Sequence, residues 1–556
     1  MNYLIHIPEP EEALPSLKSK NGMLQWLAST DHKQLGIMYM WTALFFFLLG
    51  GLEAMLMRIQ LALPGLEIIS PELYNQVFTM HGTTMVFLVL MPMLIGFATY
   101  FLPLMIGANE MAFPRLNAMS LWMTVLGGLL LNFSFLAGGA PDAGWFSYAP
   151  LSEKNYSFTN GLDYYCISLI VTGIGSIGAA LNFVVTTLTM RTKGMRIQDV
   201  PLFVWMIFIN GFLMLAAFPL LNGGLFMLLI DRLFGAHFFL PESGGSALLW
   251  QHFFWAFGHP EVYILALPAF GIISEVIPVF SRKPIFGYKL IAGSTIIIAL
   301  LAYGVWAHHM FAAGMGNAVN TFFAASSMLI GIPTGIKIIN WVGTMWGGSI
   351  HLKVPMLFAL AFLVDFTIGG LSGISFAIVP LDWQLTDTYY VVAHIHYVFL
   401  GGTLFGIFAG VYYWFPKMSG KMLSEKLGKW HFWLFVIGFN LTFLFQHALG
   451  IMGMPRRVYT YPDLPLYGLF NFIGTVGAFM MMFSVMVFIW NVFTSIRKGK
   501  PAGDDPWDAW TLEWAATSPP TLKNFDTLPE VKSKRPLWDW KHPEMADYLE
   551  DNEKDK

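Results

Sequence analysis

Two histidines stand one residue apart in an apolar stretch of this chain, in the segment His394-Ile395-His396. An imidazole at the depth of a membrane is costly, so such a residue usually has a partner or a ligand to bind. Successive residues of a helix turn by about 100°, so side chains two positions apart point to nearly opposite sides. We therefore expect one helix to hold two separate groups, one on each flank.

Four further histidines lie in apolar stretches, at His81, at His259 and in the adjacent pair His308-His309. Adjacent histidines diverge on a regular helix, so binding of one metal by both requires a local irregularity. Three neutral imidazoles suit copper. Each motif alone also fits hydrogen-bonded polar residues, but together the six histidines point to a metal or haem protein.

Other residues that could do chemistry accompany these histidines. Glu261 and Tyr263 follow His259, and the four-residue spacing places Tyr263 on the same helix face as His259. The segment Pro333-Thr334-Gly335-Ile336-Lys337 puts a lysine inside an apolar helix. Such a lysine either extends to the membrane interface or takes part in a proton relay.

The elements that must position these residues are membrane-spanning helices. The 556 residues are 56% hydrophobic and 12% charged, against about 25% charged residues in soluble domains. Segments long enough to cross a bilayer number about twelve, and only helices satisfy their own backbone there. We predict an all-α polytopic membrane protein whose spans begin near Gly36, Thr79, Asn117, Tyr165, Leu202, Leu248, Lys289, Val319, Val354, Thr388, Trp430 and Leu469.

Loop charge and the chain ends give the expected organisation. Lysine and arginine gather in the loops that are cytoplasmic if both ends are cytoplasmic, which predicts an N-in, C-in topology. We divide the chain into a cytoplasmic N-terminal segment (1–34), a twelve-helix domain (35–496) and an extended cytoplasmic tail (497–556). The net charge of −3 says nothing about nucleic acid, and no nucleic-acid partner is expected. The single Cys166 excludes an internal disulfide or a thiolate cluster.

Four motifs occur in a fixed order: Gly-His-Pro-Glu-Val-Tyr at 258–263, Trp-Ala-His-His at 306–309, Thr-Gly-Ile-Lys at 334–337 and Val-Ala-His-Ile-His at 392–396. In these motifs the chain resembles subunit I of the haem–copper oxidases, in the proton-pumping branch. The resemblance runs from about Thr30 to Asn491. It implies a terminal oxidase that reduces dioxygen to water and pumps protons.

The resemblance implies two haems, expected to be haem A, and one copper. A low-spin haem would take His81 and His396 as its axial ligands. A high-spin haem on the opposite flank of the same helix would take His394. The copper facing it would be bound by His259, His308 and His309, with Tyr263 linked covalently to His259 as in the family.

The resemblance also implies proton paths and haem contacts. One path would use Lys337, Thr334, Ser274 and Tyr263. A second would enter at Glu110, which stands where the family has an aspartate, pass Asn117 and end at Glu261. Haem propionates and the haem formyl group would be contacted by Arg456, Arg457, Trp145 and Arg58.

Two cation sites of the family also differ in this chain. A His-Asp pair that binds magnesium reads Thr386-Asp387 here, so either magnesium is absent or Asp387 holds it with more water. An acidic residue that helps bind calcium or sodium in some members is Gln60.

The resemblance implies partners as well. Electrons would come from cytochrome c through a dinuclear copper centre in subunit II, with subunit III, further small membrane subunits and a respiratory supercomplex as other partners. Leu49 and Leu73 replace an arginine and a histidine of quinol-oxidising members, whereas Gln76 and Glu53 keep a quinol donor open. The expected location is a bacterial cytoplasmic (inner) membrane.

Two other functions account for fewer of these residues than the oxidase does. An ion transporter without redox chemistry would explain Lys337 and Glu261 but not six histidines. Nitric oxide reductases lack the counterparts of Tyr263 and Lys337.

Overall fold

The computed structural model describes residues 22–528 and 531–543, and it confirms twelve helices long and apolar enough to span a membrane. Parts of the predicted N-terminal segment and tail, residues 1–21, 529–530 and 544–556, lie outside the described residues. The α-helices are α1 (Gly22–Leu27), α2 (His32–Gln60), α3 (Pro71–Thr83), α4 (Met91–Ile106), α5 (Pro114–Phe133), α6 (Gly161–Thr189), α7 (Leu202–Phe234), α8 (Ala247–Ser281), α9 (Tyr288–Ala302), α10 (Asn317–Met345), α11 (Val354–Ala377), α12 (Val379–Leu385), α13 (Tyr389–His396), α14 (Phe405–Ser419), α15 (Glu425–Ile451), α16 (Pro465–Lys498) and α17 (Pro536–Lys541).

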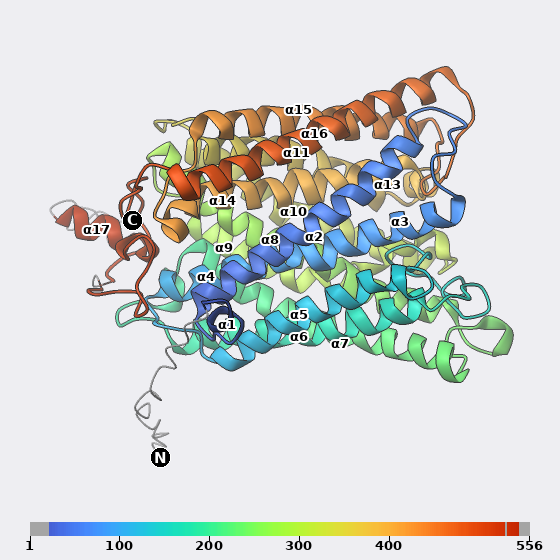
Figure 1. Ribbon diagram of the computed structural model, residues 1–556, viewed down its shortest axis with the longest axis horizontal. Coiled ribbons are helices and arrows are strands. Elements are labelled where there is room, and N and C mark those ends of the chain that lie inside the picture. Colours follow the sequence, from blue (N-terminus) through green and yellow to red (C-terminus); the bar gives the residue numbers. More distant parts are fainter. Residues whose placement is uncertain (1–21, 529–530, 544–556) are drawn as a thin grey trace, which may run out of the picture.

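The long helices run side by side in one bundle, and helices that follow one another in sequence pack together, as α5 does with α6 and α15 with α16 (Figure 1). Both ends of the described chain lie at the same end of the bundle, which is the result expected for an even number of spans. The described residues contain no strand, only two isolated bridges, Thr388–Pro455 and Lys421–Pro501.

Several spans depart from a regular α-helix at, or just after, candidate histidines. The π-helical segments η1 (Thr84–Leu90) and η6 (Tyr397–Leu404) follow α3 and α13. A 3₁₀ segment, η5 (Trp306–Ala313), follows α9 and carries His308 and His309. Such irregular turns occur often at functional sites, because they redirect side chains that a regular helix would point apart. The remaining short 3₁₀ segments are η2 (Ser134–Leu136), η3 (Ile197–Asp199), η4 (Pro241–Ser243) and η7 (Leu512–Ala515).

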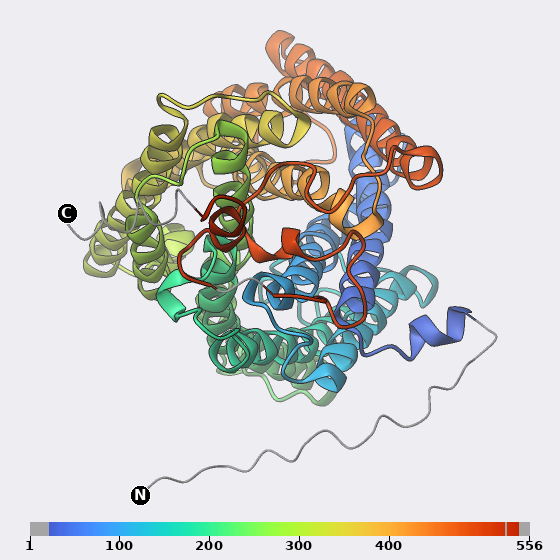
Figure 2. The ribbon, with the colours of Figure 1, turned by 90° about the vertical axis from the view of Figure 1, so that its left-hand side faces the viewer.

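The segment after α16 packs across the end of the bundle, where Figure 2 shows it in red. It contains little regular structure apart from η7 and α17, yet Leu512 and Trp514 are fully buried. The Lys417 ammonium at the end of α14 donates to carbonyl groups of this segment, including that of Asp504 at 3.0 Å. The apolar side chains of the segment after α16 therefore cover one end of the core.

Candidate metal centre

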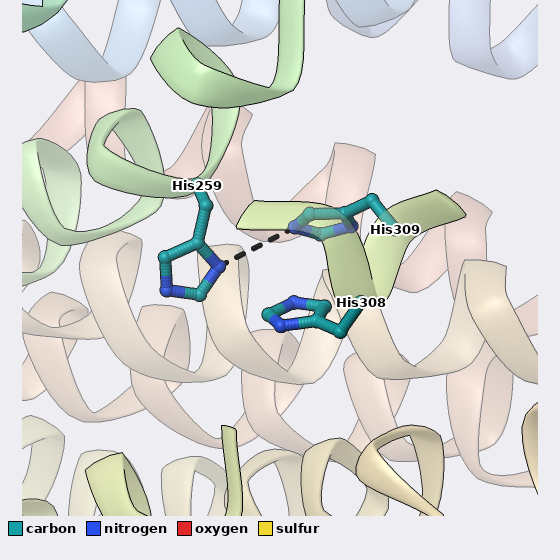
Figure 3. A group of neighbouring side chains, drawn as sticks. All are labelled: His259, His308 and His309. Atoms are coloured by element: carbon teal, nitrogen blue, oxygen red, sulfur yellow. Dashed lines mark hydrogen bonds between the residues drawn. The ribbon is translucent and has the colours of Figure 1, made fainter. Parts of the chain in front are cut away.

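Three of the predicted ligands, His259, His308 and His309, form one cluster. His259 comes from α8 and the other two from η5, and a nitrogen from each lies within 4.8 Å of the others. Figure 3 shows the three rings converging, with His259 Nδ1 at 3.4 Å from His309 Nε2. The 3₁₀ turn supplies the irregularity that adjacent histidines need in order to face one centre.

The cluster fits a metal ion bound by imidazoles. His259 is buried, and its Nε2 has no hydrogen-bond partner within the described chain. His308 Nδ1 lies 2.8 Å from the Ser327 hydroxyl of α10, a contact that fixes the ring and directs its other nitrogen. Because imidazole nitrogens suit copper and no carboxylate belongs to the group, copper is the ion that this donor set favours.

Aromatic rings hold the cluster in place. The Trp255 indole stacks on His309, with ring centres 4.0 Å apart and an interplanar angle of 13°. Tyr263 lies one helical turn after His259, with ring centres 4.8 Å apart. The spacing of these two residues along α8 therefore brings the phenol to the edge of the cluster, as the i, i+4 relation predicts.

His81 of α3 and His396 of α13 face each other. Their rings are nearly parallel, at 13°, and their centres are 6.4 Å apart. Two imidazoles that bind one ion from opposite sides, each at a metal–nitrogen distance of about 2 Å, have centres roughly 6 Å apart. The Nδ1 atoms lie 2.8 Å from the Gly50 carbonyl and 2.7 Å from the Val392 carbonyl, so each Nδ1 donates and each Nε2 is left as an acceptor. The pair fits the two axial ligands of a haem.

His394 lies on the other flank of α13. Its Nδ1 is 3.0 Å from the Gly369 carbonyl and 2.9 Å from the Ser372 hydroxyl, both on α11. His396 instead stacks on Phe443 of α15, with ring centres 4.1 Å apart. One helix thus presents two imidazoles to two different surroundings, and the Nε2 of His394 is again left for a ligand.

Comparison with known proteins decides the family. Residues 34–480 match the family model described as "Cytochrome C and Quinol oxidase polypeptide I". This chain belongs to that family. It is subunit I, the catalytic subunit, of a haem–copper terminal oxidase.

The most similar relatives include three bacterial proteins, each named cytochrome c oxidase subunit 1. The Bacillus subtilis protein is 49% identical, covering 95% of this chain and 85% of the relative. The Alkalihalophilus pseudofirmus protein is 51% identical, covering 94% and 83%. The Corynebacterium glutamicum protein is 48% identical, covering 97% and 93%. A solved haem–copper terminal oxidase dimer shares the fold, with a TM-score of 0.70 over 84% of both chains at 19% identity.

The predicted lysine path lies inside the subunit. Lys337 is 0% exposed, so it does not extend to the membrane interface. Its ammonium donates to the Ile291 carbonyl at 2.8 Å and to the Thr295 hydroxyl at 2.5 Å, both on α9. The hydroxyls of Thr334 and Ser274 donate to carbonyls of their own helices, so direct hydrogen bonds do not join them to Lys337.

The carboxyls of the second path differ in their surroundings. Glu261 in α8 is 1% exposed, and neither of its oxygens has a hydrogen-bond partner among the described residues. Glu110 lies in the loop between α4 and α5, where burial raises the pKa of its carboxyl to about 7. Asn117 in α5 is buried, and its amide also lacks a described partner. The three residues are not hydrogen-bonded to one another.

The predicted haem-contacting arginines lie at the other end of the bundle. Arg457 lies over the Phe146 ring at 4.1 Å, and the largest cause of its pKa falling to about 10 is burial. The backbone carbonyl of Trp145, next to Phe146, accepts the Tyr165 hydroxyl at 2.6 Å. Arg58 in α2 donates to the Asn471 carbonyl at 2.7 Å.

Asp387, the residue left from the family's magnesium pair, forms an ion pair with Arg456 at 2.6 Å. Its side chain is 73% exposed, and its backbone is in the left-handed region at φ +58°. A carboxylate that is already paired with an arginine is a weakened ligand for a cation.

Sequence reasoning missed the residues that orient the histidines. Ser327, Ser372 and the carbonyls of Gly50 and Gly369 hold the Nδ1 atoms, but each lies on a different helical segment from the ring that it contacts, 19 to 31 residues away in sequence. A serine in an apolar helix is the one signal in the sequence, and many serines share it. Only the packing of the helices distinguishes Ser327 and Ser372 from the other serines.

Proposed function

We propose that this subunit reduces dioxygen to water with electrons from cytochrome c and couples the reaction to proton pumping. The observation that carries the proposal is the pair of imidazole sites served by α13, one holding His81 and His396 and the other holding His394. The three-histidine cluster on α8 and η5 supports it.

When bound, two haems and a copper supply the electron transfer and the oxygen binding. His81 and His396 would hold the low-spin haem, which would supply electron transfer. His394 would hold the high-spin haem, which would supply oxygen binding. His259, His308 and His309 would hold the copper.

Protons reach the site through this chain's own side chains. The partly buried Tyr263 phenol donates a proton at its hydroxyl. Lys337 carries protons toward it, with Thr334 and Ser274 as hydroxyls on the way. Glu110 takes protons from the cytoplasm, and Glu261 passes them on after Asn117. An ionisable group without an ionic partner in a membrane helix is typical of such paths.

On the outer side, Arg456, Arg457 and Trp145 would contact haem propionates, and Arg58 the formyl group of haem A. Both chain ends would be cytoplasmic, in the cytoplasmic membrane of a bacterium. Haem–copper oxidase subunits I assemble with partner subunits such as subunit II. The dinuclear copper centre on subunit II, subunit III, further small subunits, cytochrome c and a supercomplex complete the proposed assembly.

A second candidate is a quinol-oxidising enzyme of the same fold. Glu53 in α2 is buried, and one of its carboxylate oxygens has no hydrogen-bond partner in the described part of the chain. Such a group could bind a quinol hydroxyl. Leu49 and Leu73 oppose this alternative, because they remove the polar pair expected beside it.

A reduced-minus-oxidised spectrum with extraction of the haems tests the proposal. We expect two haem signals, low-spin and high-spin, and haem A on extraction. A protein without haem bands would contradict the oxidase function. A donor assay with cytochrome c and with a quinol then separates the two candidates.

A further inference from the structure

The C-terminal segment inserts one buried amide beside the loop that carries Glu110. Asn524 is 1% exposed. Its amide nitrogen donates to the carbonyl of Ala108 at 2.8 Å and lies 3.1 Å from the carbonyl of Asn109. These are the two residues that immediately precede Glu110.

The same amide contacts the start of α2. Its nitrogen lies 3.0 Å from His32 Nε2, and its oxygen accepts the Lys33 ammonium at 2.8 Å. His32 Nδ1 lies 3.1 Å from the Thr99 carbonyl, which can only accept, so Nδ1 carries the proton and Nε2 accepts from Asn524. The His32 ring is therefore held between α4 and the C-terminal segment.

His32 in turn holds the Glu110 carboxylate. The His32 backbone N–H lies 3.1 Å from one carboxylate oxygen and 3.3 Å from the other. The N–H of Met111 donates to the same carboxylate at 2.9 Å. Asn524 thus contacts both supports of Glu110: the backbone before it and the residue that binds its oxygens.

The backbone at this position restricts the choice of residue. Asn524 has φ +66°, in the left-handed region, which asparagine, aspartate and glycine adopt more readily than other residues. Glycine has no side-chain amide, and aspartate has no donor for the Ala108 carbonyl or for His32 Nε2. Asparagine alone of these three combines the turn with a donor and an acceptor.

We propose that Asn524 is a positioning residue for proton entry: it fixes the loop and the His32 ring so that the Glu110 carboxyl stays at the mouth of its path. The proposal rests on the proposed entry of protons at Glu110. It gives the C-terminal segment a function beyond covering the core.

The test is the rate of proton uptake from the medium during a single turnover of the purified complete oxidase. Asn524→Gly keeps the left-handed turn and removes the amide. We expect it to slow proton uptake about fivefold, a factor that corresponds to roughly one net hydrogen bond. The haem spectrum and electron transfer to the low-spin haem should not change. Asn524→Asp, which still pairs with Lys33, should also slow uptake because it cannot donate to the Ala108 carbonyl or to His32 Nε2.

Two further variants make the result decisive. Asp504→Ala removes the acceptor of a tail hydrogen bond to the Ser518 N–H, away from Glu110, and should leave proton uptake unchanged. The double variant Asn524→Gly, Glu110→Gln should be no slower than Glu110→Gln alone, because Asn524 acts through Glu110. Additive slowing would show general damage and would overturn the proposal.

The two proposals fail in different ways. If Glu110→Gln takes up protons at the wild-type rate, the entry at Glu110 is wrong, and the Asn524 proposal falls with it. If Glu110→Gln is slow while both Asn524 variants are normal, the entry stands and the positioning function of Asn524 is wrong.

Discussion

At the scale of residues, the subunit places single ionisable groups in the membrane interior, where the free energy of a charged side chain is unfavourable. Lys337 is fully buried and bonded only to neutral oxygens, those of Ile291 and Thr295. Glu261 has no described partner at all. A charge in such a place is costly, so we expect each group to act by holding or releasing a proton.

Replacing Lys337 by methionine tests the lysine path. We expect Lys337→Met to slow reduction of the high-spin haem by at least about a hundredfold, because proton delivery by a positioned group is worth roughly that factor. Stopped-flow spectroscopy measures the rate of this haem reduction. Lys289→Met, at an exposed lysine that begins a neighbouring span, is the control. Normal reduction kinetics in Lys337→Met would remove the lysine from the path.

The pH dependence of proton uptake tests Glu110. Burial is the largest cause that raises the pKa of its carboxyl to about 7; Asp31 adds to this, whereas Lys33 and the N–H donors of Met111 and His32 oppose it. The protonated share therefore falls about tenfold for each pH unit above 7. We expect proton uptake to slow above about pH 7.

In Glu110→Gln, uptake should be slow at every pH, and this pH dependence should be lost. Glu72→Gln, at an exposed carboxylate that starts α3, should keep the wild-type profile. An unchanged profile in Glu110→Gln would contradict the assignment.

At the scale of elements, α8 and the irregular turn η5 supply the three histidines of the cluster, and α10 supports them. Ser327 fixes the His308 ring from α10, and partners of this kind are typically worth tenfold to a hundredfold in metal affinity. We expect Ser327→Ala to weaken copper binding by about tenfold, measured by copper content after dialysis against a chelator. Ser326→Ala is a close control, because Ser326 bonds only to the Phe323 carbonyl of its own helix. Equal copper loss in both variants would refute the argument.

The close packing of α13 on α15 offers a second element-scale test. A Cβ at Gly450 would lie 2.1 Å from the Tyr390 backbone nitrogen, so Gly450→Ala must displace α13. We expect a loss of about 1–3 kcal/mol in stability and a shifted low-spin haem band. Gly370→Ala, where a Cβ meets nothing within 4 Å, is the control. An unshifted band in Gly450→Ala would show that α13 tolerates the change.

At the scale of the whole molecule, the proposed electron route requires a partner subunit. Its one cysteine, Cys166, is buried in α6, so a copper centre built on two cysteines must lie in another chain. We expect subunit I with both haems, isolated from its partners, to be reduced by dithionite but not by cytochrome c. Adding subunit II should restore oxidation of cytochrome c. Oxidation of cytochrome c by the isolated subunit would contradict the proposed route.

The sequence by itself determined the membrane helices and the family. Twelve apolar segments must be helices because nothing in the bilayer core can satisfy an open backbone, and the histidine motifs identify the family because their order is specific. The sequence also placed His394 and His396 on two flanks of one helix, since that follows from helical geometry alone.

Only the tertiary structure decided what holds those residues in place. The 3₁₀ turn that brings His308 and His309 to one centre, the serines that orient the rings and the amide of Asn524 beside Glu110 all depend on contacts between separate segments of the chain. Local sequence patterns report which face of a helix is apolar. They do not report which helix lies opposite that face, because helix packing is set by the fit of many side chains at once.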